Sequence, residues 1–100
     1  MVKEDLISDP AVLLYFTSPD CTVCKSLKPK VRDLVKEKFP LMEMKEINIK
    51  DFPEIAAKFG VFTIPVILVY FEGKEFIRKI RNTGIYELEQ ELSRPYSLFF

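Results

Sequence analysis

The apolar run at residues 11–17 places the strongest constraint on the fold of this 100-residue chain. Its sequence is Ala-Val-Leu-Leu-Tyr-Phe-Thr, in which polar residues do not alternate with apolar ones. A strand without such alternation is buried on both faces, which is typical of a sheet that lies between two layers of helices. The run therefore predicts an α/β architecture.

Hydrophobic periodicity and turn residues predict the remaining helices and strands. Helices are expected over 2–8, from 21 or 22 to 39, over 52–59, and from 85 to a point before Pro95; strands are expected over 11–17, 42–49, 66–71 and 75–81. Helical crossovers followed by a hairpin predict a mixed sheet of about four strands with helices on both faces. With 48% apolar residues, the chain suits one domain over 1–100.

The charge and composition of the chain exclude several classes of function. Fifteen basic and fifteen acidic residues cancel, so no overall field favours nucleic acid or an anionic membrane. The apolar runs are too short to cross a bilayer, and the charged N-terminus does not resemble a secretory signal, which favours the cytoplasm. The chain contains no histidine, which excludes histidine-based catalysis and histidine-ligated metal.

Cys21 and Cys24 are the only cysteines, and they lie two residues apart at the expected start of the long helix. Unpaired N–H groups and the helix dipole at this position favour a thiolate. Cys21 is expected on the exposed first turn as the attacking thiol, with Cys24 deeper as the resolving thiol. Two ordinary buried cysteines are the simpler alternative. A structural zinc site requires four ligands, so two thiols do not complete one.

A second motif, Thr63-Ile64-Pro65, stands directly before an apolar strand. Together with the cysteine motif it makes the chain resemble the thioredoxin family over nearly its whole length. The resemblance rests on Tyr15 to Lys25 (strand, CxxC and trailing lysine), Pro29, the segment from Lys58 to Pro65, Gly73 and Leu88. It implies that Pro65 is cis and faces the cysteines, and that the backbone of Ile64 pairs with a bound peptide substrate.

The chain also departs from the family pattern. Cys21 comes earlier than usual, so the family's first strand is expected to be missing. Thr22-Val23 replaces the usual Gly-Pro, and Asp20 stands where the family has tryptophan. The family's buried aspartate falls at Tyr15, and its partner lysine falls at Glu46. Glu46 is either a solvated strand residue or a substitute carboxylate, buried beside the thiols as a general base.

Two further features allow more than one interpretation. Arg81, where the family usually has glycine, is either an exposed residue at a strand end or a group that contacts the thiolate or a substrate carboxylate. The apolar C-terminal cluster after Pro95 is expected to fold onto the domain, and the alternative is an exposed surface for dimerisation or partner binding.

The sequence thus predicts a cytoplasmic, monomeric thiol–disulfide oxidoreductase that reduces protein disulfides through Cys21 and Cys24. The predicted site includes Glu46, Ile64 and Pro65 and requires no bound cofactor or metal. An external reductant such as a thioredoxin reductase would return the protein to its dithiol form. The alternatives are a glutaredoxin-like reductase that uses glutathione and a thioredoxin-fold scaffold with weak redox activity.

Overall fold

The computed structural model describes residues 3–81 and 83–100 and contains the expected order of elements. Residue 2, at which the first helix was expected to begin, lies outside the described residues. The helices are α1 (Lys3–Leu6), α2 (Thr22–Lys38), α3 (Pro53–Lys58) and α4 (Ile85–Phe99), and the strands are β1 (Ala11–Thr17), β2 (Glu43–Asn48), β3 (Val66–Phe71) and β4 (Lys74–Ile80).

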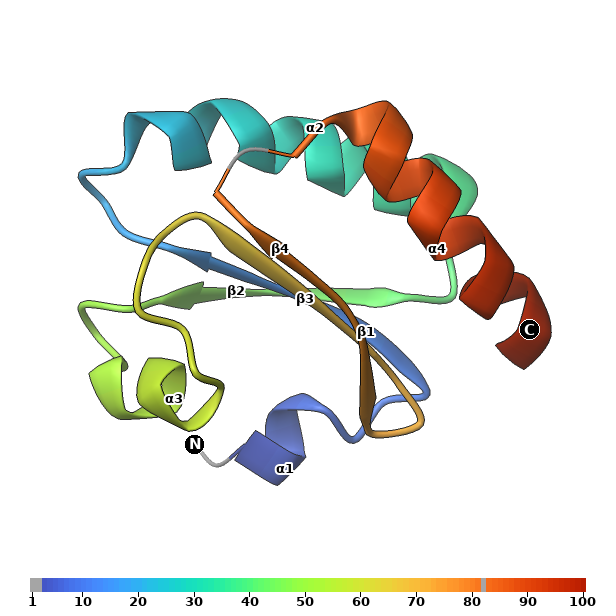
Figure 1. The fold of residues 1–100 in the computed structure, drawn as a ribbon, viewed down its shortest axis with the longest axis horizontal. Coiled ribbons are helices and arrows are strands. Elements are labelled where there is room, and N and C mark those ends of the chain that lie inside the picture. Colours follow the sequence, from blue (N-terminus) through green and yellow to red (C-terminus); the bar gives the residue numbers. More distant parts are fainter. Residues whose placement is uncertain (1–2, 82) are drawn as a thin grey trace.

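The four strands form one mixed sheet in the order β2-β1-β3-β4 (Figure 1). Strand β1 pairs in parallel with β2 and antiparallel with β3, and β3 pairs antiparallel with β4. In the part of the chain that the structure describes, the sheet has four strands, and β2 and β4 are its edge strands.

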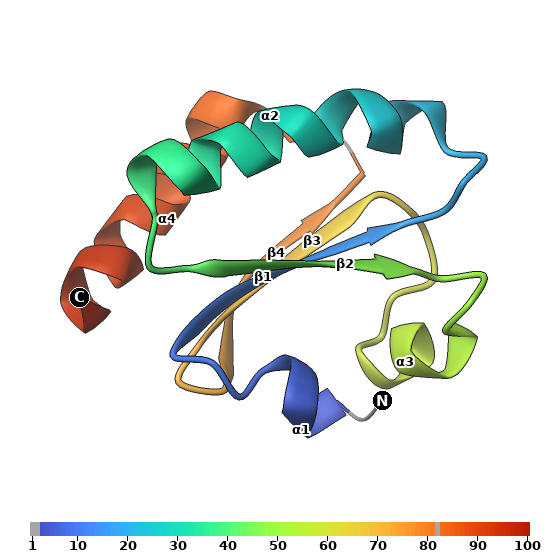
Figure 2. The ribbon, with the colours of Figure 1, turned by 180° about the vertical axis from the view of Figure 1, so that it is seen from behind.

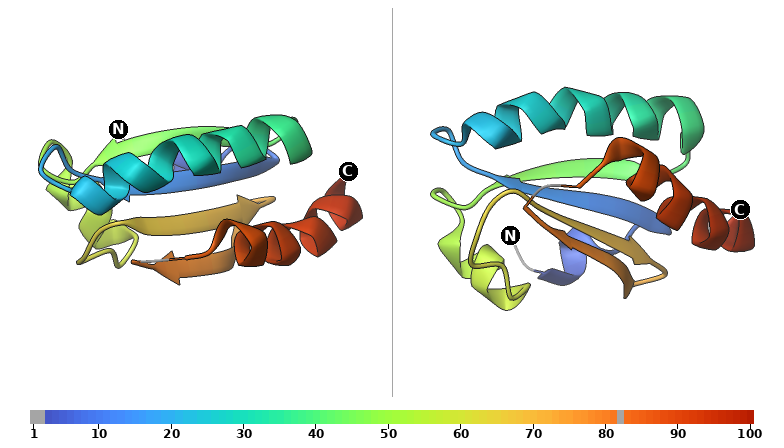
Figure 3. Two further views of the ribbon diagram at one scale, coloured as in Figure 1. Left: turned by 90° about the horizontal axis from the view of Figure 1, so that it is seen from above. Right: turned by 45° about the horizontal axis from the view of Figure 1, so that its top comes forward.

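Helices cover both faces of the sheet, as the continuous apolar strands predict. Helices α2 and α4 lie on one face, and α1 and α3 lie on the other (Figures 1, 2 and 3). The side chains of β1 divide between two hydrophobic cores, with Leu13 and Tyr15 on the α2 and α4 side and Leu14 and Phe16 on the other. All seven residues of β1 are buried.

The backbone arrangement brings three chain segments together at one end of the strands of the sheet. Phe16, near the end of β1, pairs with Val66 at the start of β3, which also pairs with Ile80 at the end of β4. The residues that follow β1, precede β3 and follow β4 therefore meet at this end of the sheet. Both sequence motifs lie there.

Helix α4 extends beyond the residue at which it was expected to end. It continues through Pro95 to Phe99, although proline cannot donate the backbone hydrogen bond of an internal helical residue. Aromatic packing stabilises the added turn. The Tyr96 ring lies 5.0 Å from that of Phe39, and the Phe99 ring stacks on Phe71 at 5.2 Å. The C-terminal segment thus packs onto the sheet and α2, while Leu98 remains 74% exposed.

None of the helices in the described part of the chain has both the length and the apolar character needed to span a bilayer.

Candidate active site at the N-terminus of helix α2

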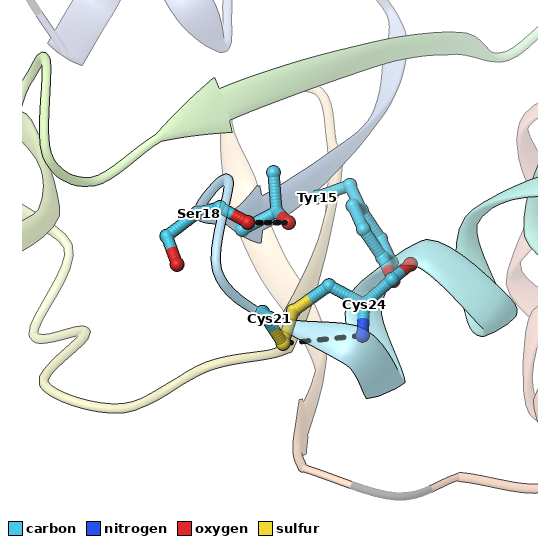
Figure 4. The surroundings of a disulfide bond; sticks show 5 residues. Tyr15, Ser18, Cys21 and Cys24 are labelled. Carbon is cyan, nitrogen blue, oxygen red and sulfur yellow. Dashed lines mark hydrogen bonds between the residues drawn. A yellow bond between two sulfur atoms is a disulfide. The ribbon is translucent and has the colours of Figure 1, made fainter.

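The two cysteines lie where the loop after β1 enters α2, and they form a disulfide with their Cα atoms 5.2 Å apart (Figure 4). Cys21 is the N-cap residue of the helix, and Cys24 lies in its first turn. Cys21 is partly exposed, whereas Cys24 is only 1% exposed. The difference in exposure allows a substrate to reach Cys21 more readily than Cys24.

The side chain of Cys21 caps the helix itself. Its Sγ accepts a hydrogen bond from the backbone N–H of Cys24 at 3.1 Å. A sulfur atom in this position faces the unpaired N–H groups and the positive end of the helix dipole, which stabilise a thiolate once the disulfide is reduced.

The carboxylate of Asp20 is neutralised by a neighbouring lysine. Asp20 forms an ion pair and a hydrogen bond with Lys50, which follows β2. The hydrogen bond from Lys50, assisted by its charge, lowers the pKa of Asp20 below its usual value. Asp20 therefore remains ionised, and Lys50 offsets the repulsion that a lone carboxylate would exert on a thiolate at Cys21.

The structure brings Ile64 and Pro65 next to Cys21. A hollow of about 310 Å³ is lined by Cys21, Thr22, Val23, Ile64, Pro65 and Arg81. The peptide bond between Ile64 and Pro65 is cis. The hollow is thus largely apolar and opens beside the more exposed cysteine.

Tyr15 lies behind the buried cysteine. Its side chain is 0% exposed, and its hydroxyl donates a hydrogen bond of 2.7 Å to the carbonyl oxygen of Cys24 (Figure 4). Burial, and secondarily the charge of Glu46, raise the pKa of Tyr15 to about 12. The phenol is therefore neutral near pH 7 and acts as a hydrogen-bond donor, where the family's aspartate would supply a carboxylate.

Glu46 lies opposite Tyr15 in the pairing of β1 with β2, but it is not buried. Its side chain is 44% exposed and forms an ion pair of 3.1 Å with Lys28 on α2. Of the two interpretations of Glu46, the structure agrees with the solvated strand residue and contradicts the buried carboxylate, because β2 is an edge strand and solvent reaches Glu46. Glu46, Lys28 and Cys24 nevertheless line the same hollow of about 400 Å³.

Lys28 was not identified from the sequence as part of this site. Helical spacing contained a signal, because Lys28 follows Cys24 by four residues and therefore lies one turn further along the same helix face. Its partner depends on how β2 aligns with β1, which the spacing of the residues does not reveal.

Within residues 3–81 and 83–100, no group of three or more histidine, cysteine or acidic side chains is placed to hold a metal ion.

Comparisons with known proteins agree with this geometry. The thioredoxin family model matches residues 2–94. The "Thioredoxin-like protein YdfQ" of Bacillus subtilis is 41% identical over 86 residues, which cover 86% of this chain and 76% of that protein.

Solved structures show the same fold. Thioredoxin from Fasciola hepatica superposes with a TM-score of 0.80 at 28% identity, covering 91% of this chain and 88% of that one. Thioredoxin 1 from Thermosipho africanus gives a TM-score of 0.79 at 28% identity, covering 87% and 96%. These matches favour neither the glutathione-dependent nor the scaffold alternative. The chain belongs to the thioredoxin family and is a thiol–disulfide oxidoreductase with its CxxC pair at Cys21 and Cys24.

Proposed function

We propose that this protein is a protein-disulfide reductase in which Cys21 is the nucleophile and Cys24 the resolving thiol. The observation that carries the proposal is the position of the pair. Cys21 caps α2 beside an apolar hollow, and Cys24 lies almost fully buried one turn further along the helix.

The reaction has two thiol–disulfide exchange steps. The Cys21 thiolate attacks one sulfur of the substrate disulfide, a mixed disulfide forms, and the other substrate sulfur leaves as a thiolate. The Cys24 thiolate then attacks the Sγ of Cys21 and releases the second substrate thiolate. Two electrons pass to the substrate, and the protein ends in the disulfide form seen in this structure.

Ile64 and Pro65 are proposed to bind the substrate chain. Ile64 is partly exposed and lines the hollow beside Cys21, so its backbone is accessible to an extended peptide. Main-chain hydrogen bonds with Ile64 would hold substrates of varied sequence in a common orientation. Pro65 shapes the floor of the hollow and cannot donate such a bond.

Glu46 is proposed to accept the proton of Cys24 in the second step. It is the only acidic residue among those that line the hollow behind Cys24. Because it is exposed and paired with Lys28, the transfer would pass through water in that hollow. Superimposable pH profiles of disulfide reduction for Glu46→Gln and the parent protein would rule out this role.

We further propose that residues 1–100 act as one monomeric domain in the cytoplasm, without a bound cofactor. Both cysteines belong to the redox pair and none is left for a structural disulfide, which is usual in a reducing compartment. An external reductant of the thioredoxin reductase type would return the disulfide to the dithiol.

Insulin reduction in the presence of dithiothreitol tests the proposal. The parent protein is expected to accelerate the reaction, whereas Cys21→Ser should not differ from dithiothreitol alone. A redox titration tests the direction of transfer, since a reductase is expected near or below about −230 mV. Insulin reduction no faster than the background would contradict the proposed activity, and a potential above about −180 mV would indicate an oxidant or isomerase.

A further inference from the structure

Among the described residues, Arg81 is the one permanently charged residue that lines the hollow beside Cys21. The other residues that line this hollow are Cys21, Thr22, Val23, Ile64 and Pro65, and none of them carries a permanent charge. A charged group next to the substrate path affects which disulfides bind productively, because complementary charges favour one partner and repel another.

The backbone holds Arg81 at this position. It follows β4 directly, and its N–H donates a hydrogen bond of 2.6 Å to the carbonyl oxygen of Pro65. Its φ angle is +67°, a left-handed conformation that glycine adopts without strain and arginine does not. Strained non-glycine residues cluster at binding and active sites, and this one lies at the rim of the substrate hollow.

The guanidinium of Arg81 is available to a ligand. Its side chain is exposed, and in the described part of the chain the basic residues that form ion pairs are others, namely Lys28, Lys45, Lys50, Arg78 and Lys79. Asp20, which precedes Cys21 in the chain, already forms an ion pair with Lys50. A guanidinium without an acidic partner binds carboxylates well, because its planar N–H groups match both carboxylate oxygens.

We propose that Arg81 forms a carboxylate subsite that selects disulfides with an acidic group next to the reacting sulfur. The inference rests on the proposed function, because it names the substrate class of the same site. The carboxylate belongs either to an acidic residue of a peptide or to a small thiol such as glutathione. Arg81 is thus a specificity-determining residue and takes no part in the bond exchange.

Three peptide dimers, each linked by one disulfide and with blocked termini, provide the test. They differ only in the residue beside cysteine, which is Glu, Gln or Lys. The pre-reduced protein is mixed with an excess of each dimer, the reaction is quenched with acid, and released peptide thiol is measured by chromatography. We expect the Glu dimer to react about threefold to tenfold faster than the Gln dimer and the Lys dimer to react most slowly.

Variants of Arg81 show whether the substrate preference depends on the charge of this side chain or on the local backbone structure. Arg81→Gln is expected to reduce the Glu preference to within about twofold, and Arg81→Glu should reverse it. Arg81→Lys keeps the charge without the planar guanidinium and should retain part of the preference. The matched control is Arg94→Gln, which removes an exposed arginine from α4 and should leave the preference unchanged. Arg81→Gly removes the charge and the backbone strain together, so it tests the charge effect in a variant that folds without that strain.

Glutathione disulfide and its tetraethyl ester form a second matched pair. A dependence on Arg81 with the peptide dimers assigns the subsite to a protein substrate, and a dependence confined to the glutathione pair assigns it to a small thiol. The inference would be overturned if the parent and Arg81→Gln showed the same preference among the three peptide dimers and also the same preference between glutathione disulfide and its ester. If the parent reduced no peptide dimer, the proposed function itself would fail. Equal reduction of all three dimers, together with no dependence on Arg81 in the glutathione pair, would count against the subsite alone.

Discussion

The hydroxyl of Tyr15 donates a hydrogen bond of 2.7 Å to the backbone carbonyl of Cys24, the buried member of the redox pair. The contact connects the central strand β1 to the first turn of α2. It positions the helix turn that carries both sulfur atoms, and it does so through a neutral donor.

Substituting Tyr15 with Phe tests this contact. The change keeps the ring and removes the donor, so we expect the free energy of unfolding to fall by about 1 kcal/mol. Urea unfolding of the oxidised and reduced forms measures the effect in each redox state. Tyr86→Phe is the control, because Tyr86 is 73% exposed and its substitution should have little effect. An equally small effect at Tyr15 would contradict a stabilising role.

Tyr15 also makes the stability of the folded protein depend on pH in the alkaline range. Its pKa is raised from 10.0 to about 12 by burial, so the folded protein retains this proton more strongly than the unfolded chain. The resulting stabilisation is complete below about pH 10 and is lost as the pH rises towards 12. The difference in stability between the parent and Tyr15→Phe should therefore shrink over that range. A constant difference up to pH 12 would mean that the phenol titrates as it does in the unfolded chain.

Substituting Cys24 with Ser is expected to trap the substrate. Cys21 would still attack, but no second thiol could release the mixed disulfide, which should persist at least about 100-fold longer than in the parent protein. Mass spectrometry of the protein after reaction with a peptide disulfide would detect the adduct at Cys21. An adduct that decays as fast as in the parent would show that Cys24 is not the resolving thiol.

Asp20→Asn is expected to make Cys21 more reactive. The substitution removes a negative charge beside Cys21 and leaves the Lys50 ammonium unpaired, so the thiolate is favoured. The midpoint of the pH profile for alkylation of reduced protein by iodoacetamide should move down by roughly half a pH unit. Lys50→Met should move it in the opposite direction. If both variants shifted the midpoint the same way, the charge explanation would be wrong.

Tyr96→Ala tests whether the last turn of α4 contributes to stability. The Tyr96 ring packs against Phe39, and its hydroxyl accepts a hydrogen bond from the backbone N–H of Leu41 at 3.1 Å. Loss of both contacts is expected to lower the free energy of unfolding by about 2–3 kcal/mol. Leu98→Ala, at an exposed position on the same turn, should change it by less than about 0.5 kcal/mol. Equal effects of the two substitutions would show that the turn does not pack as described.

The elements that the sequence predicted correctly have strong local signals. The unbroken apolar residues of β1 and β3 indicated a sheet covered on both faces, and the structure shows helices on each side. The predicted end of α4 was wrong, because the prediction assumed that Pro95 would interrupt the helix as proline normally does. The compensating contacts of Tyr96 and Phe99 come from Phe39 and Phe71, which are distant in sequence.

Part of the candidate site was also predictable from local sequence signals. The helical position of Cys21 and Cys24 indicated one exposed and one buried cysteine, and the structure has that arrangement. The sequence left Glu46 open between a solvated and a buried carboxylate, because its exposure depends on the place of β2 at the edge of the sheet. The hydrogen bond between Tyr15 and Cys24 likewise depends on how α2 packs against β1.

The position of β2 at the sheet edge also bears on aggregation. An edge strand offers unpaired backbone groups with which a strand from another molecule can pair. Two charged side chains of β2 are anchored to opposite helical layers, with Lys45 bound to Asp9 and to the carbonyl of Leu6, and Glu46 bound to Lys28. A second chain that extended the sheet would have to accommodate or displace both anchored charges, so the β2 edge resists fibril-like growth.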